Sequence, residues 1–263
     1  MMSSDTQQYK HYHDEAFEAK DLVETHFSHG QVPGIEQCVG FPLGVLHKWA
    51  SKGVLKGSKL LDLSVGSSVF QLFPVVDIYK EIYMVEFTES NIDHLKLWLD
   101  KDEKATDWTF AAKRACQLEG NRQDWKVKED QVRQAVQQVV KWENHHTTPI
   151  DPKLVPEVDC LLVMYILSVC KTKEEFKSCL KNAASRLKVE GQLVLFSPIN
   201  MSYYKVGQQK FFALTMDEKT LQELVMSVGF IIEEYDLMKN AEKSDILDYS
   251  HVCCIRARLA PEA

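Results

Sequence analysis

The fold is decided by the stretch Leu60-Leu61-Asp62-Leu63-Ser64-Val65-Gly66-Ser67-Ser68 and by Glu81-Ile82-Tyr83-Met84-Val85-Glu86, which follows it. Each stretch opens as a short apolar run of the length of a buried strand. The first then passes into a turn of small residues, and we expect a helix to begin near Val69. Two strands joined in this way indicate the start of an α/β domain.

Strands and helices alternate from this stretch to the C-terminus. We expect helices at residues 89–99, 131–141, 173–187 and 217–227, and strands at residues 110–115, 158–167, 192–197, 230–235 and 252–257. Such alternation predicts a mostly parallel sheet with helices on both faces. No clear helix separates the last two strands, which leaves room for one of them to run antiparallel.

Helical pieces precede the sheet. A helix is expected at residues 21–27, where Leu22, Val23 and Phe27 share one face, and a second helix from Ile35 to Trp49. This segment is too short to bury a core of its own. We therefore expect a single domain, residues 1–263, in which residues 1–50 form an N-terminal helical cap on an α/β core of residues 51–263.

The composition is that of a globular protein. Of the 263 residues, 45% are hydrophobic and 26% are charged, which excludes wholesale disorder. No apolar run approaches the roughly 20 residues of a membrane helix, so no membrane partner is expected. The net charge of −7, without a basic block, argues against nucleic acid as a partner. The seven cysteines include no Cys-x-x-Cys pair, and we expect a cytoplasmic location.

The ligand of such a sheet binds beyond the carboxyl ends of the strands. Glu86 closes the second strand, where a carboxylate can accept both hydroxyls of a ribose, although an acid at a strand end is also common as a solvated terminus. The loop after Leu63 lacks the glycine fingerprint of a dinucleotide site and the ending of a P-loop. A nicotinamide-dependent oxidoreductase is thereby disfavoured. The remaining class of ligand is a nucleoside without a phosphate group, and S-adenosylmethionine is such a ligand.

Several segments resemble those of a known family. They are Leu60-Leu61-Asp62, Asn91, Leu118-Glu119-Gly120-Asn121-Arg122 with the helix after it, and Ser202-Tyr203-Tyr204-x-x-Gly207-x-Gln209-Lys210-Phe211. Their order and spacing are similar to the nicotinamide / phenylethanolamine / indolethylamine (thioether) N-methyltransferase family, nearest to its nicotinamide branch. The resemblance implies a Rossmann-like class I methyltransferase fold, with a seven-stranded sheet and an N-terminal helical lid. It also implies a monomer that uses S-adenosylmethionine to methylate a small-molecule amine, pyridine or thioether.

The resemblance further implies which residues bind the cofactor. They are Leu22 and Phe27 in the lid, Ser64, Val65, Gly66 and Phe70 in and after the first loop, Glu86, Phe87 and Asn91 after the second strand, and Glu143 and Asn144 after the long helix. The first loop departs from the family's pattern. Ser64 stands where the family has glycine, and the β-branched Val65 suits a tight turn poorly.

On the acceptor side, the resemblance points to Ser197, Tyr204 and Ala213. Tyr204 either covers an aromatic acceptor or serves as ordinary lid packing. The family's carboxylate near the end of the fifth strand is absent from residues 197–201, so we expect a neutral or aromatic nitrogen as acceptor. No catalytic acid or base is assigned, because in-line methyl transfer depends mainly on alignment.

Two functions remain open at this point. The favoured one is an active S-adenosylmethionine-dependent small-molecule N-methyltransferase. The alternative is an impaired or inactive homologue that acts as a ligand-binding or regulatory protein, because the first loop is altered. No metal site is expected: His145-His146 is interpreted as an exposed loop pair, since two adjacent histidines do not readily face one ion and no third ligand is apparent.

Overall fold

The computed structural model describes residues 9–12, 19–27, 34–143, 145–241 and 244–261. At its centre is a seven-stranded sheet in the order β3-β2-β1-β4-β5-β9-β8. The strands are β1 (Lys59–Ser64), β2 (Glu81–Glu86), β3 (Val136–Lys141), β4 (Val158–Met164), β5 (Leu187–Ile199), β8 (Phe230–Lys239) and β9 (His251–Leu259). Strands β1 to β5 pair in parallel, and β9 runs antiparallel to both β5 and β8. The mostly parallel sheet is confirmed, with β9 as its antiparallel member.

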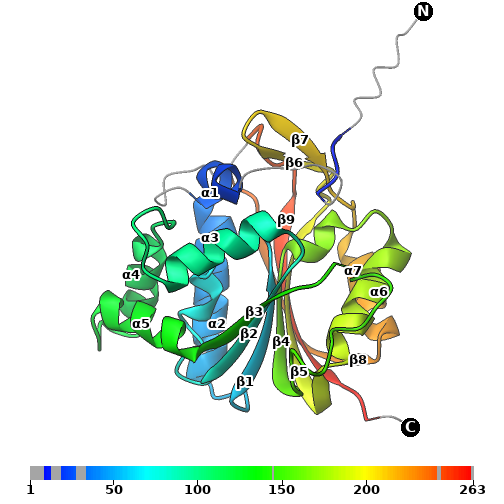
Figure 1. The fold of residues 1–263 in the computed structure, drawn as a ribbon. Coiled ribbons are helices and arrows are strands. Elements are labelled where there is room, and N and C mark those ends of the chain that lie inside the picture. The colour runs from blue at the N-terminus through cyan, green and yellow to red at the C-terminus, as the bar shows by residue number, and fades with distance from the viewer. Residues whose placement is uncertain (1–8, 13–18, 28–33, 144, 242–243, 262–263) are drawn as a thin grey trace, which may run out of the picture.

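Helices cover both faces of the sheet (Figure 1). They are α1 (Ala19–Phe27), α2 (Phe41–Ser51), α3 (Glu89–Leu99), α4 (Thr109–Leu118), α5 (Trp125–Ala135), α6 (Lys173–Ala184) and α7 (Glu218–Ser227). Side chains of α2 to α5 pack into one apolar core, and those of α6 and α7 pack into a second core on the opposite face. Within β1, Leu61 and Leu63 belong to one core and Leu60 to the other, because successive side chains of a strand point to opposite faces.

Two expected elements were wrong in type. Residues 110–115 are not a strand but lie in α4, where Ala111, Ala112 and Ala115 form a buried helical face. Residues 131–141 are not one helix, because α5 ends at Ala135 and β3 follows. Their apolar spacing fits a helix, but three of the six residues of β3 are valines, which favour an extended backbone packed in a sheet.

Several expected boundaries also shift. The strand expected at residues 158–167 ends at Met164, because Tyr165 takes a left-handed backbone with φ of 64° before a 3-10 turn, η4 (Ile166–Val169). The helix expected near Val69 is only a 3-10 turn, η3 (Phe70–Leu72). The second N-terminal helix opens with a π-helical turn, η2 (Glu36–Gly40), ahead of α2. The helix at 173–187 ends at Ala184, since Leu187 already begins β5.

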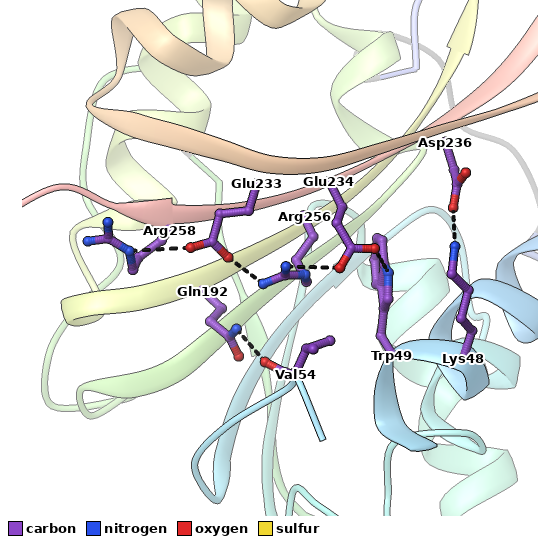
Figure 2. A network of polar contacts seen from close by, with 9 residues as sticks. All are labelled: Lys48, Trp49, Val54, Gln192, Glu233, Glu234, Asp236, Arg256 and Arg258. Carbon is purple, nitrogen blue, oxygen red and sulfur yellow. Dashed lines mark hydrogen bonds and ion pairs between the residues drawn. The ribbon is translucent and has the colours of Figure 1, made fainter. Parts of the chain in front are cut away.

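Helix α2 is fixed to the sheet by polar contacts to β8 (Figure 2). Trp49 Nε1 donates to Glu234 Oε2 at 2.7 Å, and Lys48 Nζ lies 2.8 Å from Asp236 Oδ2. Glu234 also accepts from Arg256 on β9 at 3.0 Å. Part of the N-terminal 50 residues is therefore a layer of the α/β core rather than a lid.

Helix α1 lies at the end of the sheet with the hairpin of β6 (Tyr203–Val206) and β7 (Gln209–Phe212), as Figure 1 shows. Its first residue, Ala19, donates its amide to Ser90 Oγ at 3.1 Å. At its other end, His26 Nε2 lies 2.6 Å from the Lys205 carbonyl oxygen, and Thr25 Oγ1 accepts from the Gly207 amide at 2.9 Å. Helix α1 thus bridges α3 and the hairpin. No helix in the described ranges is long and apolar enough to cross a membrane.

Candidate functional site

The loop after β1 is built on a buried carboxyl group. Asp62 accepts hydrogen bonds from Ser64 Oγ at 2.7 Å and from Gln71 Nε2 at 3.0 Å. Burial raises the pKa of Asp62 to about 7, although both hydrogen bonds act in the opposite direction. Ser64, which replaces the glycine of the family's pattern, therefore satisfies a buried carboxyl group here.

The lid contacts this loop at Gly66. The backbone of Gly66 is left-handed with φ of 63°, and a Cβ at this position would lie 2.4 Å from Cδ2 of Leu22. Only glycine combines this conformation with so close an approach. The amide of the preceding residue, Val65, donates a hydrogen bond to the Met164 carbonyl oxygen at 2.9 Å and so connects the loop to β4.

A buried acid–amide pair stands at the carboxyl end of β2. Asn91 Nδ2 donates to Glu86 Oε2 at 3.2 Å and to the hydroxyl of Tyr12 at 2.6 Å. Burial raises the pKa of Glu86 well above its usual range, and Asn91 partly offsets this. Asn91 Oδ1 and Ser67 Oγ are buried and have no hydrogen-bond partner within the described part of the chain. The site therefore retains polar capacity that a ligand could use.

Phe87 follows Glu86 and presents a buried ring. The imidazole of His145 stacks on it, with ring centroids 4.1 Å apart and an angle of 16° between the planes. The expectation of an exposed His145 was wrong, since this residue is 3% exposed. The flat apolar face of Phe87 makes this stacking favourable.

A pocket lies beyond the carboxyl ends of β1, β4 and β5, under α1 and the hairpin. Its cavity volume is about 70 Å³, and it is lined by Leu22, His26, Phe27, Cys38, Val65, Tyr165, Ser168, Val169, Pro198, Met201, Tyr204, Leu247, Tyr249 and Val252. These described lining residues include no Asp, Glu, Lys or Arg. Burial lowers the pKa of His26 to about 4, so its ring is neutral at pH 7. The pocket is therefore apolar, aromatic and uncharged.

Tyr165 shapes the pocket from the end of β4. Its φ of 64° is unusual for a residue with a bulky side chain. Its hydroxyl donates to the Cys38 carbonyl oxygen at 2.9 Å, which fixes the ring across the pocket. Strained backbone of this kind is concentrated at ligand sites. Sequence reasoning missed Tyr165, although its place at a strand end was a usable signal.

Most of the residues expected at the site lie together. Leu22, Phe27, Val65 and Tyr204 line the pocket, and Ser64, Gly66, Glu86, Phe87 and Asn91 form the loop and the β2 end beside it. Phe70 packs behind Phe27, with ring centroids 5.7 Å apart. Tyr12 and Tyr249 were missed, because no local motif marks them.

Other expected residues lie elsewhere. Ser197 is buried, with its Oγ donating to the Pro198 carbonyl oxygen at 3.3 Å, and Ala213 is buried too; neither lines the pocket. The side chain of Glu143 is 66% exposed and pairs with Lys141 Nζ at 2.8 Å. Asn144 lies outside the described residues.

The fold is shared with solved methyltransferases. A S-adenosylmethionine-dependent methyltransferase from Clostridium acetobutylicum has a TM-score of 0.56 at 7% identity, covering 92% of this chain and 98% of that one. The 1,6-didemethyltoxoflavin-N1-methyltransferase of Burkholderia thailandensis has a TM-score of 0.53 at 13% identity, covering 92% and 87%. The expected class I methyltransferase fold is confirmed.

Sequence comparison is more specific. Indolethylamine N-methyltransferase of Oryctolagus cuniculus is 31% identical over 247 residues, which are 93% of this chain and 94% of that protein. Nicotinamide N-methyltransferase of Homo sapiens is 30% identical over 92% of both chains. The model of the NNMT/PNMT/TEMT family matches residues 5–260. The chain therefore belongs to the NNMT/PNMT/TEMT family.

Proposed function

We propose that the protein is a S-adenosylmethionine-dependent N-methyltransferase whose acceptor is a neutral, aromatic nitrogen of a small molecule. The observation that carries this proposal is the uncharged aromatic pocket beside the buried pair of Glu86 and Asn91. The relatives named above are N-methyltransferases, which supports the same reaction. The alternative of an inactive homologue finds no support in these relatives.

The residues present suit an adenosyl ligand in their chemistry. Glu86 would hold the ribose hydroxyls, Phe87 would carry the adenine ring, and the backbone at Gly66 would pass under the methionine part. The unpartnered Asn91 Oδ1 and Ser67 Oγ offer further acceptors for ligand donors. S-adenosylmethionine, when bound, supplies a methyl group on a positively charged sulfur.

Two side chains lie against these residues. The hydroxyl of Tyr12 lies on Asn91, and the His145 ring covers Phe87. Both would have to move before a nucleoside could bind. Both belong to connecting segments, which rearrange more easily than the strands that carry Glu86 and Asp62.

The protein's own contribution to the reaction is alignment and exclusion of water. Orientation of two reactants can supply roughly 7–11 kcal/mol. A neutral aromatic nitrogen already carries a lone pair, so no base has to remove a proton. Burial raises the pKa of Tyr204, which keeps its hydroxyl protonated and suits it to cover an acceptor ring rather than to act as a base.

The remaining expectations are part of the same proposal. We infer one domain over residues 1–263, in which the part of residues 1–50 that precedes α2 forms the cap and α2 joins the core of residues 51–263. We also infer a monomeric state, a cytoplasmic location, and no nucleic acid or membrane partner. The low net charge density and the absence of a basic block support the lack of a nucleic-acid role.

Calorimetric titration with S-adenosylhomocysteine tests the proposal most directly. Binding of one equivalent at micromolar concentration, followed by methylation of a pyridine in the presence of S-adenosylmethionine, is the expected result. Absence of binding at millimolar ligand would overturn it.

A further inference from the structure

A second group of reactive side chains lies outside the pocket. The ligand atoms of His145, His146 and Glu175 all lie within 4.8 Å of one another. His145 Nε2 and His146 Nδ1 are each 3.8 Å from Oε1 of Glu175. The sequence showed no third ligand beside the two histidines. The fold supplies one, because the first turn of α6 packs against the loop after β3.

The carboxylate of Glu175 is held in place by the start of α6. Its Oε2 accepts a hydrogen bond from the Lys171 amide at 2.7 Å, and its own amide donates to Thr172 Oγ1 at 3.1 Å. This is close to a capping box, in which a residue of the first turn reaches back over the helix N-terminus. With Oε2 engaged in this way, Oε1 is the oxygen that faces the two imidazoles.

The imidazole of His145 is also in contact with neighbouring rings. It stacks on Phe87 at 4.1 Å and meets the ring of Trp142 edge-on at 6.0 Å. Two of the three side chains are therefore held before any ion binds, and His146, which is exposed, can adjust.

The contacts of the two histidines with Glu175 are too long for hydrogen bonds. At 3.8 Å, neither histidine nitrogen is within hydrogen-bond range of Oε1. With metal–ligand bonds of about 2.1 Å, the ligand atoms of a tetrahedral site lie about 3.4 Å apart, so the two contacts to Oε1 would each shorten by about 0.4 Å. Two imidazole nitrogens and one carboxylate oxygen form the donor set of open zinc sites.

We propose that His145, His146 and Glu175 bind a divalent transition metal ion of the zinc type, with a fourth position open to water. The three residues border an open hollow, which provides the entry path. The charged side chains around it are Lys141, Glu143, Lys171 and Glu174. Lys141 pairs with Glu143 at 2.8 Å and with Glu89 at 3.3 Å, which limits its repulsion of a cation.

Titration of the full-length, tag-free protein tests the site after chelator treatment has removed bound metal. Calorimetry with Zn²⁺ and visible absorption with Co²⁺ are expected to show one saturable site. Glu175→Gln and His146→Ala are each expected to weaken binding by about tenfold or more. The glutamine retains a carbonyl oxygen for the Lys171 amide, so α6 keeps its cap, and the exposed His146 tolerates truncation.

Glu174→Gln is the matched control, because this acid borders the same hollow and lies in the same helical turn but is outside the cluster. It is expected to leave the affinity within about twofold. Absence of saturable binding of either metal would overturn the site, as would equal losses for Glu174→Gln and Glu175→Gln. Metal binding is measured without cofactor, so its failure would leave the separate titration with S-adenosylhomocysteine unaffected.

Discussion

The hydroxyl oxygen of Tyr12 lies 2.6 Å from Nδ2 of Asn91, which is the same amide nitrogen that contacts Glu86. Both partners are buried, and they are 79 residues apart in the sequence. Tyr12 therefore takes up hydrogen-bonding capacity at the end of β2, where a ribose would present its own hydroxyls. An adenosyl ligand at Glu86 would therefore compete with Tyr12 for this place.

Tyr12→Phe is accordingly expected to strengthen binding of S-adenosylhomocysteine. Loss of the hydrogen bond to Asn91, worth about 1 kcal/mol, gives a gain of about fivefold. Calorimetry compares this variant with Tyr9→Phe, because the Tyr9 ring lies against Tyr203 on the hairpin and should not affect the site. Weaker binding by Tyr12→Phe would show instead that the hydroxyl contacts the ligand.

Glu86→Gln is expected to weaken binding of S-adenosylhomocysteine by about tenfold or more, because a carboxylate accepts the ribose hydroxyls more strongly than an amide does. The shape of the side chain is kept, so the melting temperature should change little. Glu89→Gln is the control, since Glu89 is exposed and pairs with Lys141 at 3.3 Å. Equal affinities of the Glu86 variant and the wild type would remove Glu86 from the cofactor site.

Gly66→Ala is expected to destabilise the fold by about 2–4 kcal/mol, since a methyl group meets Leu22 and the left-handed backbone is strained. Gly120→Ala separates the two effects, because Gly120 has a φ of 78° but an open surrounding. Urea unfolding measures both. In the double variant Leu22→Ala with Gly66→Ala, the smaller side chain should remove the steric part of the loss in stability. If the losses of the two single variants simply add, the contact between Leu22 and residue 66 is contradicted.

The sequence predicted the parts of the fold that depend on local pattern. The strand Glu81–Glu86 and the helix Glu89–Leu99 have the expected bounds, because their apolar periods are unambiguous. The prediction of one helix over residues 131–141 was wrong because apolar residues spaced three and four apart continue from the helix into a strand. There, pairing with β2 overrides the helical period.

The site was predictable only where a motif follows a strand. The ends of parallel strands meet at one edge of a sheet, so Gly66 and Glu86 could be placed near each other. The positions of Tyr12 and His145 depend on how connecting segments fold back over that edge, and no local pattern encodes this. The third member of the metal cluster, Glu175, was hidden for the same reason.

Stability is expected to fall as pH rises towards 7, because of Asp62. Its pKa is raised from 3.8 to about 7 in the folded chain, so between these values the folded state binds the proton and the unfolded state does not. Asp62→Asn removes this dependence. The free energy of unfolding of this variant, relative to that of the wild type, should therefore be about 2–3 kcal/mol larger at pH 8 than at pH 5.

Urea unfolding at the two pH values measures this difference. Asp93→Asn is the control, because the Asp93 side chain is 67% exposed. A difference between Asp62→Asn and wild type that does not vary with pH would show that Asp62 is ionised throughout.

The acceptor preference follows from the uncharged pocket. A primary alkylamine is protonated at pH 7, and burying its charge among Tyr165, Tyr204 and Tyr249 without a carboxylate costs several kcal/mol. A pyridine carries no such charge, so its kcat/KM at pH 7 is expected to exceed that of the amine by about a hundredfold or more. Raising the pH from 7 to 9 should increase kcat/KM for the amine about tenfold or more, because only its free base can enter, and should leave the pyridine nearly unchanged. Radiolabelled methyl transfer to both acceptors measures this, and faster turnover of the amine at pH 7 would contradict the neutral-acceptor assignment.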